Sequence, residues 1–415
     1  MTSSYRALFA VSGVRRLVGA MVCARLGGSM IQLTSILFVL EHYHSPALAG
    51  LVGLCAGLSG ILVSPLAGAL LDRYGRVRLI CLDYGVGVAT TVALPLLAEA
   101  RLLPSWLLLV LVTLSGLSLP LSATGARSLL PLLVPRELWD RSNAVDSGTY
   151  RGCSIVGPAL AGALVAGLGS SRTMLAVSVT WIAAGLLLWG VAEPRMAVDR
   201  VRSVLHDALA GLRHVAGNRV LRRLPIVWIP GVMGISALGV VLPVLVFTRL
   251  HGNPALVGLL WSATGAGGLI ANLVTGAVRT EGREDRIMAA GFVGTTLSLA
   301  LVAVAPAAPV AALGMLLMGL CSGPVDNAMF GLRVRAIEPA WFGRSMSISM
   351  MLNSLGFPIG SGLGGQLVAR SLPGALWFVC VASLLGGLLS LLLLRPASQA
   401  AARPVLTPTG ATPDP

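Results

Sequence analysis

The sequence contains no lysine, so all 30 of its basic residues are arginines. A nucleotide-binding loop of the form G-x-x-x-x-G-K-[ST] needs its lysine to reach the phosphates. The chain therefore cannot carry such a loop, and we exclude pumping that this chain alone would drive with ATP. Charged residues of all kinds make up only 11% of the sequence, and aromatic residues only 5%.

Cysteine is scarce as well. The six cysteines stand singly inside apolar segments, with no C-x-x-C pair and no Cys/His cluster, so neither a disulfide framework nor a zinc site is indicated. His42 and His44 form an H-x-H pair that lacks further ligands, and we expect no metal and no cofactor. The net charge is +14, but the arginines are spread over many short segments. A nucleic-acid partner is excluded because it needs one contiguous basic face.

Long apolar runs occupy most of the chain. Apolar residues make up 55% of it, and the mean hydropathy is +0.85. Each run of about 20 residues is long enough to cross about 30 Å of hydrocarbon as a helix. We therefore predict an all-α membrane protein with twelve transmembrane helices, at 17–40, 46–70, 79–98, 104–127, 143–167, 172–192, 224–248, 255–278, 287–305, 309–332, 345–369 and 374–394.

The arginines also predict the orientation. An even number of spans places both termini on one side of the membrane. With Arg127 counted at the inner end of its span, that side receives 24 of the arginines, the opposite loops receive 4, and Arg25 and Arg151 lie within spans. Short loops rich in arginine stay in the cytoplasm. We expect a multi-pass protein of a bacterial cytoplasmic membrane, with both termini in the cytoplasm.

The two halves of the chain repeat each other. Pro46–Leu51 reads P-A-L-A-G-L and Pro254–Leu259 reads P-A-L-V-G-L, 208 positions later. The same offset relates Gly60 to Gly268 and Gly68 to Gly276, and an offset of 203 relates Gly157 to Gly360 and Gly162 to Gly365. Such agreement predicts two six-helix bundles related by pseudo-symmetry. Transporters built from repeats bind their substrates between the repeats, near the bilayer midplane.

The repeat divides the chain into a first bundle, a linker, a second bundle and a tail, at 1–192, 193–223, 224–394 and 395–415. In the linker, Leu205, Leu209, Leu212 and Val215 recur at helical spacing. This spacing predicts an amphipathic helix that lies on the membrane face or across the bundle. The tail is rich in Pro, Thr and Ala without periodicity, and we expect it to be disordered.

The turn between the second and third predicted spans carries a distinctive motif. From Gly68 to Arg78 it reads G-x-x-x-D-R-x-G-R-x-R. This motif resembles the signature between the second and third helices of the major facilitator superfamily, and that resemblance extends over essentially the whole chain. A basic turn occurs in any polytopic protein, but the fixed spacing of Gly, Asp and Gly favours the family signature.

In that family the turn braces the gate that closes the cytoplasmic side. The resemblance therefore implies an inner-gate network made up of Gly68, Asp72, Arg73, Gly75 and Arg76, joined by Asp83, Arg127 and Asp146. The second copy of the motif has decayed, with Thr280 at the position of Asp72. We expect that side to be braced less tightly, or by Glu281, Glu284 and Asp285.

The fifth predicted span carries a second motif. Gly152, Gly157, Pro158 and Gly162 resemble the superfamily's antiporter signature, G-x-x-x-G-P-x-x-G-G, which is associated with exporters. The match departs from the pattern twice, because Ala161 replaces a glycine and four residues separate Gly152 from Gly157. The alternative is a helix that is merely close-packed, since small residues one turn apart let a neighbouring backbone approach. Gly148 and Gly152 form one such pair. The stretches 135–144 and 210–215 resemble the bacterial branch that includes the macrolide and enterobactin exporters.

Charged residues inside the bilayer are functional candidates by default. Arg25 in the first span either faces an anionic group in the cavity or instead snorkels or pairs structurally. Asp326 in the tenth span either carries a proton or pairs with Arg333 or Arg335 as a latch. We expect Arg151 to reach another helix. The full candidate substrate or proton site comprises Arg25, Gln32, Tyr150, Arg151, Asp326 and Asn327.

The sequence thus predicts a secondary transporter and not an enzyme. We expect a monomer that exports a small hydrophobic or amphipathic molecule, of the drug, macrolide or siderophore kind, in exchange for protons by alternating access. The alternatives are an uptake symporter or metabolite facilitator of the same fold and, more remotely, a polytopic membrane enzyme. An enzyme would need clusters of acidic or histidine side chains on its loops, and these loops hold almost none.

Overall fold

The chain is helical throughout its described ranges. The computed structural model describes residues 5–191, 193, 204–275, 281–338 and 341–394, and no strand occurs in those ranges. The predicted tail, Gly276, Thr280 and most of the segment 193–203 lie outside them. So do the side chains of 204–208, including Leu205.

The predicted spans correspond to helices. Eleven helices in the described ranges are long and apolar enough to cross a membrane, and a broken pair, α13 and α14, forms the remaining span. The first six spans are α2 (Val14–Tyr43), α3 (Pro46–Tyr74), α4 (Arg76–Glu99), α5 (Ser105–Leu133), α6 (Trp139–Leu168) and α7 (Ser170–Leu188). The other six are α9 (Arg219–Thr248), α10 (Pro254–Thr275), α11 (Glu284–Val304), α12 (Ala308–Ala336), α13 (Phe342–Ser354) with α14 (Gly356–Arg370), and α15 (Leu372–Leu389) with the π-turn η3 (Ser390–Leu394).

The spans depart from their predicted bounds in detail. The eleventh span is not continuous, because Pro358 has no N–H and its ring excludes the carbonyl of Ser354. The helix is interrupted at Leu355, whose N–H donates instead to the Leu352 carbonyl at 3.3 Å. The sixth span ends at Leu188 and not at 192, and Gly190 takes a left-handed φ of +82° just beyond it.

Side-chain caps explain several helix starts. The Ser45 hydroxyl accepts from the Leu48 N–H at 3.2 Å, and a proline follows Ser45 at the first helical position. Asn218 caps α9 by accepting from two backbone N–H groups at 2.9 and 3.1 Å. Ser371 caps α15 in the same way. These polar residues satisfy N–H groups that have no partner inside the helix.

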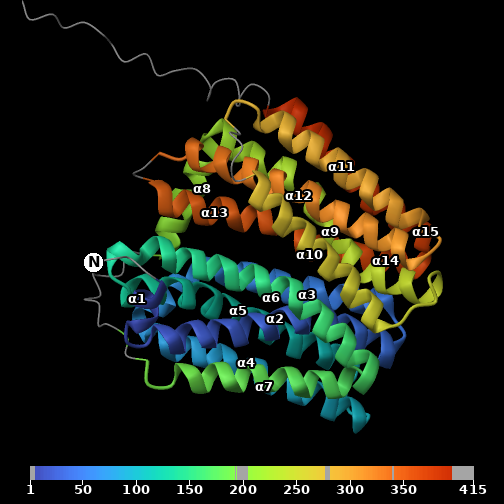
Figure 1. Ribbon diagram of the computed structural model, residues 1–415, viewed down its shortest axis with the longest axis horizontal. Helices are drawn as coiled ribbons and strands as arrows, with labels where there is room; N and C mark the ends of the chain where they lie inside the picture. Colours follow the sequence, from blue (N-terminus) through green and yellow to red (C-terminus); the bar gives the residue numbers. More distant parts are fainter. Residues whose placement is uncertain (1–4, 192, 194–203, 276–280, 339–340, 395–415) are drawn as a thin grey trace, which may run out of the picture.

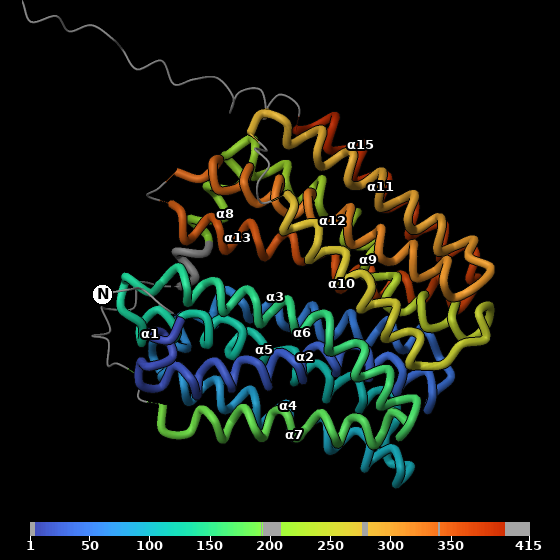
Figure 2. The backbone as a smooth tube through the Cα atoms, viewed as in Figure 1, coloured from blue at the N-terminus to red at the C-terminus, as the bar shows by residue number. Residues whose placement is uncertain are grey.

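The helices gather in two bundles (Figure 1). We call α2–α7 the N-bundle and α9–α15 the C-bundle. One end of the molecule, the terminal end, carries the short helix α1 (Tyr5–Ala10), the turn at Gly75 and the linker helix α8 (Val204–Gly217). The opposite end carries the turns that follow His44 and Gly169. The backbone trace shows the bundles converging at the opposite end and diverging towards the terminal end (Figure 2).

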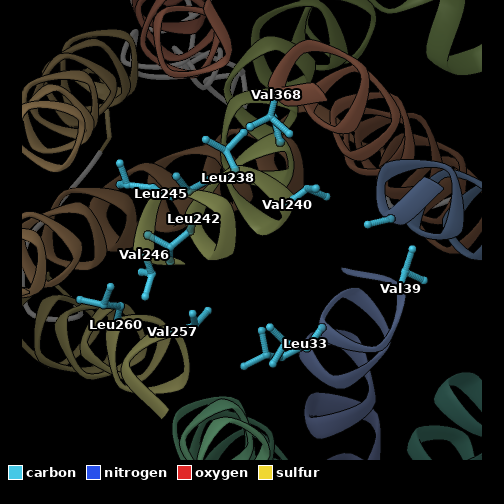
Figure 3. Packing of buried hydrophobic residues seen from close by; sticks show 14 of the residues in the cluster. Leu33, Val39, Leu238, Val240, Leu242, Leu245, Val246, Val257, Leu260 and Val368 are labelled. Atoms are coloured by element: carbon cyan, nitrogen blue, oxygen red, sulfur yellow. The ribbon is translucent and has the colours of Figure 1, made fainter. Parts of the chain in front are cut away.

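The apolar cores follow the same division. One cluster joins both bundles towards the opposite end, where Leu33 and Val39 of α2 pack in the same core as Leu242 and Val246 of α9 (Figure 3). Two further clusters lie towards the terminal end, and each stays within one bundle. One includes Leu17 of α2, and the other includes buried residues of α9 and α11–α13. Among the described residues, the bundles therefore share a core at one end only, and we infer that the space between them opens towards the terminal end.

The linker helix α8 packs on the C-bundle. Gly211 lies against Arg344 and Ile348 of α13, and the His214 ring stacks on Trp341 with 4.9 Å between centroids. Val215 is buried as the predicted stripe requires, but Leu209 and Leu212 are exposed. The packed face of α8 is thus rotated away from the stripe that the sequence spacing indicated.

Candidate functional site

Arg76 organises the turn between α3 and α4. Gly75 takes a φ of +90°, which ends α3 and allows α4 to begin at the next residue. The Arg76 side chain is only 10% exposed. It donates to Asp72 Oδ1 at 2.6 Å and to Ser128 Oγ of α5 at 3.1 Å. The turn is therefore held by groups within the N-bundle.

Glu193 completes this turn, and the sequence analysis missed it. Its carboxylate accepts from the backbone N–H of Arg76 at 2.9 Å and from that of Val77 at 3.3 Å, and it lies 3.4 Å from the Arg76 guanidinium. A carboxylate at this place satisfies free N–H groups and the positive end of the helix dipole. The one available signal was an isolated acidic residue directly after the last span of the first half.

Other residues of the predicted inner-gate network lie elsewhere. Asp83 is buried inside the N-bundle, where its carboxylate accepts from Ser118 Oγ at 2.6 Å. An added Cβ on Gly68 would meet open space. Arg73 is exposed and lies 5.4 Å from the Tyr74 ring. In this conformation the expected joining of Asp83 and Arg127 to the Asp72–Arg76 pair does not occur.

Asp146 of α6 instead gathers two arginines from other helices. Its Oδ1 pairs with Arg25 of α2, which also donates to Thr149 Oγ1 at 2.5 Å. Its Oδ2 lies 3.5 Å from Arg127 of α5. Both guanidinium groups lie over the ring of Tyr150, at 5.9 and 5.7 Å from its centroid. Of the two alternatives for Arg25, the structure shows the structural pair.

Arg151 and Asp326 oppose each other from different bundles. Asp326 of α12 is exposed, and Arg151 of α6 is the charged group that acts on its carboxylate. The expected latch between Asp326 and Arg333 or Arg335 does not form in the described part of the chain. Arg335 pairs with the fully buried Glu284 of α11 instead.

The remaining candidates lie nearby. Asp326 also borders a cavity of about 40 Å³ between α9, α11 and α12, which has room for a water molecule. Asn327 donates to Thr275 Oγ1 of α10 at 2.9 Å, a contact within the C-bundle. Gln32 of α2 is exposed.

A buried cation on α12 stands apart from these pairs. The Arg333 side chain is 2% exposed, and with the Asn353 amide oriented to satisfy its neighbours it donates to the Asn353 oxygen. Within the described ranges no carboxylate lies in ion-pair distance of Arg333. The cation thus depends on a neutral amide of α13.

The glycines of α6 and α14 join the bundles. An added Cβ on Gly162 would come within 3.0 Å of the Gly258 Cα, and one on Gly365 within 2.7 Å of the Gly50 Cα. The repeat offsets map one contact onto the other. Gly157 packs on Ser29 of α2, whereas Gly148 and Gly152 face open space. The expected close packing at Gly148 and Gly152 is therefore wrong.

Hydrogen bonds reinforce these two contacts. Ser262 of α10 donates to the Ile155 carbonyl at 2.6 Å, and Ser361 of α14 donates to the Gly50 carbonyl at 3.3 Å. Both lie on the helices that the glycines bring together.

As for metals, no group of three or more His, Cys, Asp or Glu side chains that could hold an ion occurs among the described residues.

Sequence comparisons identify relatives along most of the chain. A family model described as "Transmembrane secretion effector" matches residues 3–409. An uncharacterized MFS-type transporter of Sinorhizobium fredii is 36% identical over 392 residues, which cover 94% of this chain and 96% of that protein. The multidrug efflux pump Tap of Mycolicibacterium fortuitum is 25% identical and covers 79% of this chain and 82% of its own. Macrolide efflux protein A of Streptococcus pyogenes is 23% identical, with 80% and 83% covered.

Solved structures share the fold. The nucleoside transporter NupG superposes with a TM-score of 0.71 at 12% identity, covering 94% of this chain and 100% of that one. A bacterial homologue of the iron transporter ferroportin, in an inward-facing state, gives a TM-score of 0.70 at 17% identity, with 92% and 98% covered. At these identities the likeness shows the fold alone.

Proposed function

We propose that this chain, which belongs to the transmembrane secretion effector family of the major facilitator superfamily, exports a small hydrophobic or amphipathic organic molecule in exchange for protons. Membership of the family makes it a multi-pass membrane transporter. The direction, the coupling ion and the cargo are our proposal. Relatives named as efflux pumps, aligned over about four fifths of the chain, are the observation that carries export.

The arrangement of the bundles supports transport by alternating access. The bundles share a core at the opposite end and separate towards the terminal end. This arrangement fits one of the two states that alternating access requires, the state open at the terminal end. We place the terminal end in the cytoplasm of a bacterium, because the arginine-rich turns lie there. The structure then corresponds to the state that loads substrate from inside. Each chain contains both bundles, so we propose that a monomer is sufficient.

Asp326 is our candidate for the proton carrier. Its carboxylate is exposed on α12, faces a single cation of the other bundle and borders a cavity with room for water. A carboxylate that gains and loses a proton here would change the electrostatic attraction between the bundles. Charged groups at membrane depth mark ion and proton pathways in many transporters.

The proposal is tested in everted membrane vesicles that contain the protein. Energised vesicles should accumulate at least one of dansylate, ethidium and a macrolide in their lumen, and an uncoupler should abolish that accumulation. Vesicles without the protein are the control. Accumulation by intact cells that collapses with the uncoupler would instead establish uptake and overturn export.

A further inference from the structure

The wall that the N-bundle presents near Asp146 carries more positive than negative charge. Arg25 and Arg127 both pair with the carboxylate of Asp146, and the guanidinium groups of both lie over the ring of Tyr150. Arg151 is the next residue along α6. On the other bundle, Asp326 carries the negative charge on which Arg151 acts. Three guanidinium groups therefore face two carboxylates, which leaves one surplus positive charge in the space between the bundles.

The three arginines differ in their capacity to bind another group. Arg25 is occupied by the Asp146 carboxylate, the Asp146 carbonyl and the Thr149 hydroxyl. Arg127 makes one ion pair at 3.5 Å, and its side chain is 56% exposed. Arg151 is half-buried and has no carboxylate within ion-pair distance in the described ranges. Arg127 and Arg151 thus retain free donors in a fixed fork that suits a carboxylate, sulfonate or phosphate.

Tyr150 adds an aromatic surface between these donors. Its side chain is 55% exposed even though two cations lie over the ring. An acidic group on an aromatic body would meet complementary partners here, because a cleft lined by charges of one sign attracts ligands of the opposite sign.

We propose that Arg127, Arg151 and Tyr150 form the subsite that receives the acidic group of the cargo, so that the exported molecules are amphipathic organic anions that carry an aromatic ring. This inference rests on the proposed export function and narrows it to one substrate class. A single negative charge on the cargo neutralises the surplus charge of the wall. Export of such an anion from a cell that is negative inside is also favoured by the membrane potential.

The test uses two probes that differ in charge and little else. Dansylate carries a sulfonate and dansylamide is its neutral counterpart, and both fluoresce more strongly in apolar sites. Binding to the purified full-length protein should be about tenfold tighter for dansylate. Arg127→Gln and Arg151→Gln should each remove about that factor for dansylate and leave dansylamide within twofold. Arg127→Lys keeps the charge and should retain part of the preference.

Arg172→Gln is the matched control. It removes an exposed arginine from the first turn of α7, at the opposite end of the molecule, and should bind both probes as the parent does. Thermal unfolding of each variant shows whether it is folded. Transport of dansylate, dansylamide and cationic ethidium is then compared in everted vesicles. If ethidium is exported and dansylate is bound no better than dansylamide, the anion inference fails while export stands. If none of the three is moved, the proposed function fails and takes the inference with it.

Discussion

Gly50 of α3 and Gly365 of α14 meet across the bundle interface so closely that an added Cβ on Gly50 would lie 2.8 Å from the Gly365 Cα. Their counterparts in the repeat, Gly258 and Gly162, meet in the same way, at 3.1 Å from Cβ to Cα. Two symmetry-related contacts between backbones thus close the opposite end. Under the proposed export, cargo leaves at that end, so both contacts must then separate.

A larger side chain at one of these glycines should therefore prevent closure. In Gly365→Val, the new methyl groups would strike the Pro46 carbonyl, which already lies 2.6 Å from the position of a Cβ. We expect export to fall at least about tenfold, because real Cβ contacts do not approach this closely and the backbones must separate. Transport in vesicles and labelling of the opposite end by an impermeant reagent measure both effects. Gly167→Val is the control, because an added Cβ there meets open space near the same end; equal losses in the two variants would contradict the argument.

Glu193 should stabilise the turn between α3 and α4, although it is far from that turn in the sequence. Glu193→Gln removes the charge that compensates Arg76 and weakens the cap on α4. We expect a loss of about 1–2 kcal/mol in the free energy of unfolding, as for other helix caps and partly buried charges at helix ends. Thermal unfolding in detergent measures the loss. Glu99→Gln, at the exposed far end of α4, should be nearly neutral.

Substitution of Asp72 should affect turnover far more than stability. Its side chain is 58% exposed, and its pair with Arg76 spans one helical turn. Such pairs contribute about 0.5 kcal/mol, so Asp72→Asn should unfold at nearly the parental temperature. By resemblance to the family, however, the turn braces the closed terminal end, and we expect turnover to fall about tenfold or more. Unchanged turnover at normal protein levels would remove Asp72 from the gate.

The sequence predicted the spans well because each must bury its backbone hydrogen bonds inside a helix. The repeat offsets relate the glycines that join the bundles, but the sequence did not predict that they meet. The same spacing argument failed for Gly152, because a pattern of small residues does not reveal which face of a helix meets a neighbour. It failed for the Asp326 latch as well, because Arg333 lies two turns away, about 10 Å along the helix, and Arg335 projects from the other side.

The sequence could not predict which residue pairs with a given charged side chain. Glu193 lies 117 residues from Arg76, and Asp146 lies 121 residues from Arg25. Only the packing of separate helices brings these groups together. The offset of 208 residues places Arg76 and Glu284 at equivalent positions of the two halves. Arg76 pairs with an acidic residue, Glu193, whereas Glu284 pairs with a basic one, Arg335.

Glu284 and Arg335 form the pair whose loss should cost most. Glu284 is fully buried and Arg335 is one-third exposed. Arg335→Gln would leave a buried carboxylate without its cation, at a cost of about 3–5 kcal/mol. The double variant with Glu284→Gln removes that charge as well and should recover much of the loss. A double-mutant cycle of unfolding temperatures measures the coupling, and additive losses would contradict it.

Asp326→Asn should separate proton coupling from cargo movement. If the carboxylate carries the proton, the amide cannot be protonated, and uphill export should stop while exchange of labelled for unlabelled cargo across the membrane continues. A purely electrostatic role predicts something else, because Arg151 would then merely lack its opposing charge. In that case the double variant Asp326→Asn with Arg151→Gln should regain uphill export, measured at a cargo concentration high enough to offset the weaker binding that Arg151→Gln causes. Vesicle assays with an imposed pH gradient distinguish the two, and full activity of Asp326→Asn alone would exclude Asp326 from the coupling step. If Asp326 is the proton carrier, its protonation would remove the electrostatic attraction to Arg151 of the opposite bundle, and one proton would then change the balance between the two states of the carrier.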